Sequence, residues 1–297
     1  MIINSGTLRT LFIGFSAAFQ GAYTSVMPKW NQVAMRIPST TAANEYGWLS
    51  GMPQIREWIG ERHIKQLALD AYILANRDWE TTWSVKRKDI ERDNVGGYTM
   101  MFQQAGQDAA LFPDREVFKL LKNGFTSTCY DNQFFFDSDH PIIDENDAVG
   151  TFSNTGGGSG TNWFLLDVGQ VMKPLIFQEE KPFNLVRKDR EEDDNTFMRG
   201  EYVYGLDGRM AFGYGIPQFA FGSKQTLDKT NYSNAREALM GMKRNGGVPI
   251  DTRRHLLVVP PSLEGEAKEL LEAERNAAGA TNIYRGTADL LVTNYVA

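Results

Sequence analysis

The sequence predicts an α+β fold organised around one long helix. Between Gly97 and Phe125, apolar side chains recur at helical spacing, which predicts a single helix that is either kinked or restarted at Pro113. Residues 77–94, just before this helix, alternate in polarity with the period of a β-strand and are densely charged. Residues 197–222 carry the strongest strand signals, and the last quarter of the chain alternates helix and strand. A long helix beside an outstretched ribbon suggests a building block of an assembly.

Composition and charge limit the class of protein. The 297 residues are 42% hydrophobic and 23% charged, an ordinary globular composition with room for two subdomains or one discontinuous domain. A formal net charge of −6 at pH 7 argues against simple binding of polyanions such as nucleic acid. Cys129 is the only cysteine, which excludes an intramolecular disulfide and fits a reducing cytoplasm.

The N-terminal segment predicts an arm or helix that packs on a neighbour, with a signal peptide for secretion as the less favoured alternative. Its apolar side chains lie at helical spacing, namely Leu8, Leu11, Phe12, Phe15, Ala18 and Phe19. The continuous apolar run at 11–19 is much shorter than the roughly 20 residues that cross a bilayer, so no membrane partner is expected. Residues 23–46 include Pro28 and Pro38 and predict an extended strap.

The charged ribbon predicts a second contact surface. Trp79, Thr81, Trp83 and Val85 share one face, and basic and acidic residues balance over 77–94. If the ribbon projects, this face has no core of its own chain to cover, so a neighbour is expected to bury it. Trp83→Glu should then prevent assembly without melting the free subunit. The predicted inter-subunit contacts are Trp58, Trp79, Trp83, Val85, Lys86, Arg87, Lys88, Phe12 and Phe15.

One group of side chains has the composition of a catalytic or metal site. Asp131, Asp137, Asp139 and His140 offer carboxylates and an imidazole, the groups used for divalent metals and for acid–base catalysis. Their spacing is loose and such residues commonly shape turns, so a structural turn is favoured. We predict no catalytic, cofactor-binding or metal-binding residues and no cofactor. The alternative is a cytosolic metal-dependent hydrolase that uses Asp137, Asp139 and His140.

Further elements follow from the distribution of apolar residues. Strands are expected at 163–168, 172–178, 255–259 and 289–292, and helices at 232–244 and from residue 263, where Ser262 is the expected cap. The charged residues 179–194 predict a solvated loop, and the glycines at 156–160 a flexible loop, since they lack the ending of a phosphate-binding P-loop.

Several motifs, in one order from end to end, resemble the major head subunit of Mu-type tailed phages. The residues that carry the resemblance are Tyr46-Gly47-Trp48, Arg56-Glu57-Trp58, Gly60-Glu61-Arg62, Cys129-Tyr130-Asp131, Phe135-Phe136-Asp137, Asp139-His140-Pro141, the run from Lys173 to Gln178, and Val258-Val259-Pro260-Pro261. That family is similar to the Hong Kong 97-type capsid fold. The resemblance implies an N-terminal arm and connector at 1–61, an E-loop at 62–96, a P-domain spine helix at 97–126, A-domain segments at 127–180 and 225–297, and P-domain strands at 181–224.

The function that the resemblance implies is structural. It implies a non-enzymatic major capsid protein that self-assembles into pentamers and hexamers of an icosahedral head, with weak non-specific contact to the packaged double-stranded DNA. Portal, scaffold or protease, and decoration proteins are the further partners, and the location is the virion capsid, assembled in the bacterial host cytoplasm. A tail tube or an encapsulin-like compartment is a third hypothesis, which microscopy would distinguish from a closed head. No covalent cross-link between subunits is expected.

Overall fold

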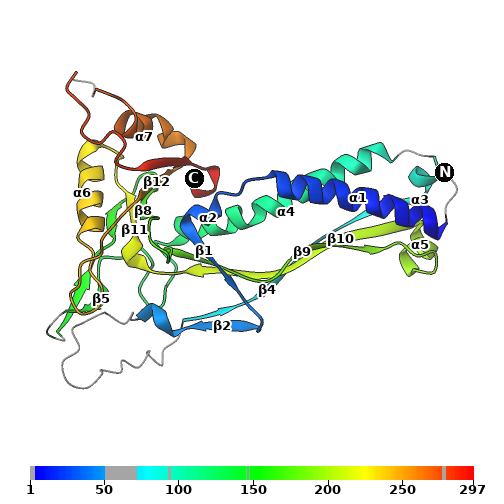
Figure 1. Cartoon of the computed structure of the whole chain (residues 1–297), viewed down its shortest axis with the longest axis horizontal. Coiled ribbons are helices and arrows are strands. Elements are labelled where there is room, and N and C mark those ends of the chain that lie inside the picture. The colour runs from blue at the N-terminus through cyan, green and yellow to red at the C-terminus, as the bar shows by residue number, and fades with distance from the viewer. Residues whose placement is uncertain (1–3, 51–71, 93–94, 145, 147, 276–278) are drawn as a thin grey trace.

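The computed structural model describes residues 4–50, 72–92, 95–144, 146, 148–275 and 279–297. The molecule is elongated, with a long arm of helices and strands that joins a compact lobe (Figure 1). The N-terminal end of the described chain lies at the tip of the arm, and the C-terminus lies where the arm meets the lobe.

The arm combines two long helices with a sheet of strand order β1-β9-β10-β4. Its elements are α1 (Ser5–Ser25), α2 (Trp30–Val33), β1 (Ala34–Pro38), β4 (Arg77–Lys86), α3 (Arg87–Glu91), α4 (Gly96–Asn123), β9 (Leu175–Lys188), α5 (Asp194–Arg199) and β10 (Glu201–Tyr214). Strand β10 is antiparallel to both β9 and β4, and β1 is parallel to β9.

The lobe contains a second sheet of strand order β13-β12-β8-β11-β7. Its elements are β7 (Thr155–Gly158), β8 (Trp163–Asp167), β11 (Ala220–Lys224), α6 (Lys229–Met240), β12 (His255–Val259), α7 (Glu264–Leu271) and β13 (Asp289–Val292). Two small antiparallel pairs, β2 (Ala43–Tyr46) with β3 (Tyr72–Ala75) and β5 (His140–Ile143) with β6 (Val149–Phe152), complete the described strands. Short 3-10 turns occupy Gly47–Ser50, Pro217–Phe219, Pro261–Leu263 and Asn294–Val296.

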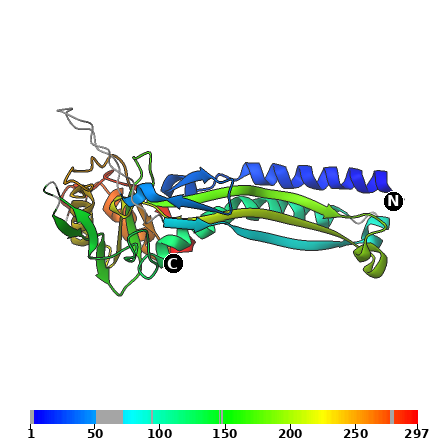
Figure 2. The same ribbon diagram turned by 90° about the horizontal axis from the view of Figure 1, so that it is seen from below.

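The lengths of helix and strand match along the arm. Helix α4 has 28 residues and β9 and β10 have 14 each, so the helix rises about 42 Å and the strands about 46 Å. One helix therefore covers the whole length of the sheet, and α1 packs beside it (Figure 2). The long helix predicted at 97–125 is confirmed, and it runs without interruption through Pro113.

Strand β9 corrects the loop expected at 179–194. The strand continues to Lys188 because Phe183 and Leu185 alternate with exposed Asn184 and Val186, and the two inner side chains pack against the helices. The charged side chains of β9 that suggested a loop lie largely on its solvent-facing side. Residues 175–179 thus pair in the arm sheet and residues 220–224 in the lobe sheet, whereas the expected boundaries placed the first group in the A-domain and the second in the P-domain.

Helix α1 begins with a capping box and packs closely on α4. The Asn4 side chain accepts a hydrogen bond from the Thr7 backbone N–H at 2.8 Å, and the Thr7 hydroxyl accepts one from the Asn4 N–H at 2.9 Å. Gly106 of α4 lies against the backbone of α1, where a Cβ atom would collide with the carbonyl oxygen of Phe19. Among the described helices, none is both long and apolar enough to cross a membrane.

The core of the lobe continues into the base of the arm. Every residue of β8 and β12 is buried, because α6 and α7 cover one face of the sheet and the arm covers the other. On the arm side, Phe164 and Val258 share a cluster with Val117 and Phe118 of α4. The strands expected at 163–168, 255–259 and 289–292 are confirmed, whereas no side-chain cap by Ser262 is present and α7 begins at Glu264.

The close crossing of α1 and α4 gives a stability prediction. Gly106→Ala should lower the free energy of unfolding by about 1–3 kcal/mol, because the added methyl group pushes α1 away from α4. Gly14→Ala is the control, since no atom lies within 4 Å of that position, and it should be neutral or stabilising by about 0.5–1 kcal/mol. Urea unfolding measures both, and equal stabilities would contradict the crossing.

Candidate functional site

The inner face of β4 is covered by the subunit's own helices. Val85 is fully buried, and the Trp83 ring lies edge-on to Phe102 of α4 with centroids 5.3 Å apart. The Trp79 ring lies 4.7 Å from that of Phe112, and its indole N–H donates to the Met210 carbonyl oxygen at 3.1 Å. These side chains therefore already have partners within one chain.

The premise that the face of Trp79, Trp83 and Val85 has no core of its own chain to cover is therefore wrong. It assumed that residues 77–94 project as a hairpin, whereas residues 77–86 form β4, which pairs with β10 along its length and lies under α4. The alternation of polarity was interpreted correctly, but its apolar side faces the spine helix of the same chain. Of the expected E-loop, residues 62–71 and 93–94 lie outside the described residues, as does Trp58.

The N-terminal helix is likewise packed on its own subunit. Phe15 is 2% exposed and stacks on Phe102, with ring centroids 4.2 Å apart, so it is not available to a neighbour. Phe12 is half-buried, stacks on Tyr204 and is covered by the Arg187 guanidinium at 4.5 Å. The predicted contact through Phe15 is wrong because the apolar stripe of α1 is used to cover α4.

The three predicted cations lie at the tip of the arm, where β4 ends and α3 begins. Lys86 and Lys88 are exposed, and Arg87 is half-exposed. The Arg87 guanidinium pairs with Glu91 at 3.1 Å and with Glu191 at 3.8 Å, and these exposed pairs contribute little to stability. This cationic group remains a candidate contact surface.

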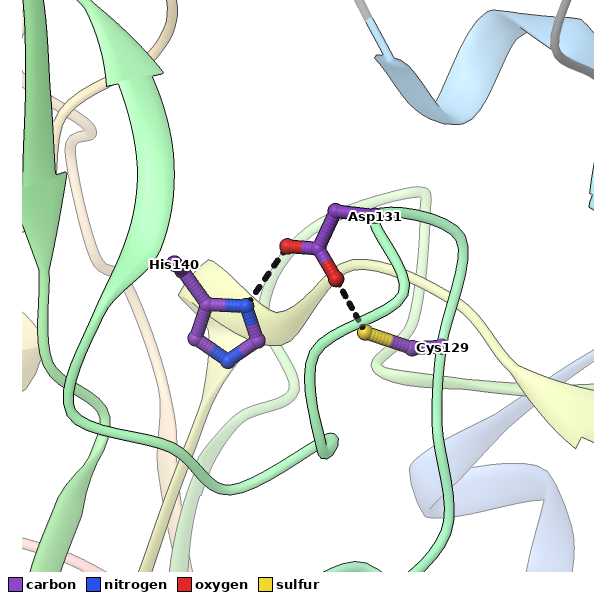
Figure 3. Close-up of side chains that lie close together, drawn as sticks. All are labelled: Cys129, Asp131 and His140. Carbon is purple, nitrogen blue, oxygen red and sulfur yellow. Dashed lines mark hydrogen bonds and ion pairs between the residues drawn. The ribbon is translucent and has the colours of Figure 1, made fainter.

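Beyond α4, a buried group joins Cys129, Asp131 and His140 (Figure 3). The Cys129 thiol donates to one carboxylate oxygen of Asp131 at 3.0 Å, and Nδ1 of His140 bonds the other at 2.7 Å. Nε2 of His140 lies 3.3 Å from the Phe135 carbonyl oxygen, and the imidazole is fully buried. The group ties the loop after α4 to the start of β5.

The electrostatics of this group favour a structural bond over catalysis. Burial raises the pKa of the Cys129 thiol, and the negative charge of Asp131 raises it further, so the thiolate nucleophile is disfavoured. Burial alone would raise the pKa of Asp131, but hydrogen bonds from His140 and Cys129 outweigh it and hold the pKa below its ordinary value. The ligand atoms of the three residues lie within 4.8 Å of one another, yet each is engaged in a hydrogen bond.

The other residues of the expected hydrolase site are not part of this group. Asp137 accepts hydrogen bonds from the backbone N–H groups of Ser138 at 2.7 Å and Phe134 at 3.3 Å, which is the behaviour of a turn-forming residue. Asp139 is exposed. The sequence therefore grouped His140 with Asp131 correctly, but it added Asp137 and Asp139 and missed Cys129, which lies only two positions before Asp131.

Comparison with known proteins decides the family. The family model of the Mu-like prophage major head subunit gpT matches residues 8–296. The chain belongs to this family of Mu-like major head subunits. The major capsid protein of Escherichia phage Mu is 37% identical over 305 residues and is covered completely, as is this chain.

Solved structures agree with the family assignment. A chain of the bacteriophage JBD30 procapsid matches the head subunit with a TM-score of 0.88 and 40% identity, over 99% of this chain and 100% of that one. A chain of the JBD30 capsid decorated with minor capsid protein trimers matches with a TM-score of 0.76 and 33% identity, over 91% of each chain.

The head subunit is therefore a structural component of a phage capsid with the Hong Kong 97-type α+β fold. Its function as a major capsid protein and its expected fold class are confirmed. The metal-dependent hydrolase has no support, since the relatives are structural capsid proteins.

The sequence also missed a pair of exposed apolar side chains on the head subunit. Phe197 and Met198 were expected in a strand, but they lie on α5, between its N-cap Asp193 and the left-handed Gly200 that ends it. An acidic cap followed by glycine is a recognisable signal for a short helix, but the neighbouring strand pattern obscured it.

The packing of β4 gives a prediction opposite to that from the sequence alone. Trp83→Ala should lower the free energy of unfolding of the unassembled head subunit by about 2–4 kcal/mol, because it removes an aromatic ring from the contact with Phe102. Ser84→Ala, on the exposed face of the same strand, should change it by less than about 0.5 kcal/mol. Thermal unfolding followed by circular dichroism measures both variants. An unchanged stability of Trp83→Ala would contradict the packing of β4 under α4 and would favour the projecting ribbon.

The buried carboxylate gives a prediction for acid unfolding. Because the pKa of Asp131 in the folded chain is below its ordinary value of 3.8, its contribution to stability is complete above pH 3.8. That contribution is lost as the pH falls through the folded pKa. The stability difference between wild type and Asp131→Asn, measured by urea unfolding, should therefore be constant above about pH 4 and shrink as the pH falls further. Asp139→Asn is the exposed control, and a difference at Asp131 that does not change with pH would contradict the bonding shown in Figure 3.

Proposed function

We propose that the head subunit forms pentamers and hexamers that close an icosahedral head around double-stranded DNA. The observation that carries the proposal is the end-to-end match to the phage Mu major capsid protein and to a subunit of the JBD30 procapsid. A closed symmetric shell needs many self-complementary contacts on each subunit, and an elongated subunit can reach several neighbours.

The tip of the arm supplies one such contact in this proposal. Lys86, Arg87 and Lys88 lie there beside acidic residues of α3 and of the loop after β9, so both signs of charge are exposed together. A surface of mixed charge pairs with another copy in a preferred orientation and resists wrong pairings. Phe12, which is half-buried, and Trp58 are further contact candidates.

Further partners fit the same proposal. One JBD30 capsid carries minor capsid protein trimers, and we propose that this shell accepts a decoration protein of that kind. Portal and scaffold or protease proteins would act during assembly in the bacterial host cytoplasm. With a net charge of −6, the subunit would contact packaged DNA weakly and without sequence preference.

Assembly of the purified chain tests the proposed function directly. The chain alone should form closed particles in negative-stain micrographs and a large species in sedimentation velocity. Tubes, or a small oligomer that never enlarges with concentration, would contradict the proposal.

The cationic tip gives a mutational prediction. Lys86→Glu with Lys88→Glu should strongly reduce the yield of particles, because it replaces attraction between copies by repulsion, while the melting temperature changes little. Lys119→Glu with Lys229→Glu makes the same change of charge elsewhere and should assemble normally. Normal assembly of Lys86→Glu with Lys88→Glu would show that Lys86 and Lys88 are not part of the contact surface.

A further inference from the structure

The tip of the arm carries two large apolar side chains in solvent. On α5, 83% of Phe197 and 76% of Met198 is exposed, and the helix lies at the end of β9 and β10 farthest from the lobe (Figure 1). Both are residues that protein interfaces favour. Burial of a phenylalanine side chain is strongly favourable, so its presentation to water needs an explanation in the assembled protein.

Helix α5 is held firmly, so its exposed pair is presented in a defined position. The Asn195 side-chain amide donates to the carbonyl oxygens of Glu201 at 2.7 Å and Lys188 at 3.2 Å, which ties α5 to the ends of both long strands. Thr196 is 4% exposed, and the Gly200 N–H donates to its carbonyl oxygen at 3.0 Å. Gly200 has a φ of 64°, which a glycine adopts readily at the end of a helix. The ordering of the pair therefore costs little on binding.

A hollow lies at the same end of the arm. Its volume is about 970 Å³, and it lies between the first turn of α1 and residues 187–193. Among the residues that line it, Leu8 is the one with an apolar side chain and is 3% exposed, and Arg9, Arg190 and Glu192 contribute charges of both signs. In Figure 2, α5 lies on the other side of the sheet from the start of α1, so the exposed pair does not fill the hollow of its own chain.

We propose that Phe197 and Met198 of one head subunit insert into the hollow of a second copy, tip to tip. The proposal rests on the proposed function as a self-assembling shell protein. We call the exposed pair Phe197 and Met198 the knob. A second copy is the occupant because the knob and the hollow lie at one end of the same chain, and because both are surrounded by mixed charges that another copy can match. Because the knob of one copy meets the hollow of the next, the two surfaces in contact differ, and the contact is heterologous. Such contacts close a ring of tips when the rotation between copies allows.

Removal of the knob tests the proposal in particles made from this chain alone. Phe197→Ser with Met198→Ser should raise the concentration needed for half-maximal assembly by about tenfold to hundredfold, as expected for the lost burial of one large apolar side chain. Its melting temperature should match that of wild type, because both side chains are exposed. The matched control is Met27→Ser with Val171→Ser, two apolar side chains that are 92% and 97% exposed outside the tip; it should assemble like wild type.

A cross-link identifies the occupant of the hollow. Met198→Cys with Ser5→Cys places one thiol on the knob and one at the hollow, and oxidised particles should give disulfide-linked multimers on a non-reducing gel. Each single variant should stay monomeric on that gel. Dimers from Met198→Cys alone would mean that knobs meet knobs and would overturn the proposal.

The remaining outcomes are also decisive. The proposal is overturned if Phe197→Ser with Met198→Ser assembles normally and Met198→Cys with Ser5→Cys gives no cross-links. Normal assembly together with lost binding of minor capsid protein trimers assigns the knob to that partner instead, which also overturns it. Failure of the wild type to assemble under any condition counts against the proposed function, and is thereby distinguished from failure of the knob alone.

Discussion

The arm depends on one aromatic contact that joins all of its layers. The Phe102 ring of α4 lies 4.2 Å from Phe15 of α1, 5.3 Å from Trp83 of β4 and 5.2 Å from Tyr204 of β10. A structure of one helix layer on one sheet has no deeper interior, so large rings at this single interface must supply most of its apolar burial. Because two helices and two strands share the same ring, none of them can separate without exposing it.

This packing has a consequence for how the shell is built. The apolar faces of α1 and β4, which the sequence suggested as contacts with neighbours, pack largely against other elements of the same chain. One exposed surface is at the tip, where Lys86 and Lys88 lie near the exposed Phe197 and Met198. The base of the arm shares its core with the lobe, and the Asp131 bonds fix the loop beyond α4. The contacts that hold the subunit together are thus made within one chain, and we propose that its far end recognises other copies.

Much of the fold follows from local sequence patterns. The spine helix, strand β4 and the strands at 163–167, 255–259 and 289–292 were predictable because each has a periodic or uniformly apolar pattern that matches its burial. Which of these elements pack against one another was not predictable. Alternation shows that Trp83 and Val85 share a face, but it cannot show that α4, which follows in the chain, folds back to cover that face. Likewise, Cys129 and His140 meet at Asp131 only through the loop between them, and loose spacing in sequence gave no measure of that distance. The charged residues of β9 led to the wrong prediction of a loop for a related reason, since a strand with one solvated face has the composition of a loop.

Hydrogen–deuterium exchange on the unassembled subunit tests most directly whether the arm folds against itself. If α1 and β4 are covered by their own chain, amide protons of β4 that bond to β10 and those of α1 near Phe15 should exchange slowly, at rates similar to those of β8 and β12 in the lobe. Assembly into particles should change them little and should instead protect the tip around α5. Rapid exchange of β4 and α1 in the free subunit, with protection gained only in particles, would contradict this account, because it would mean that neighbouring copies supply the cover.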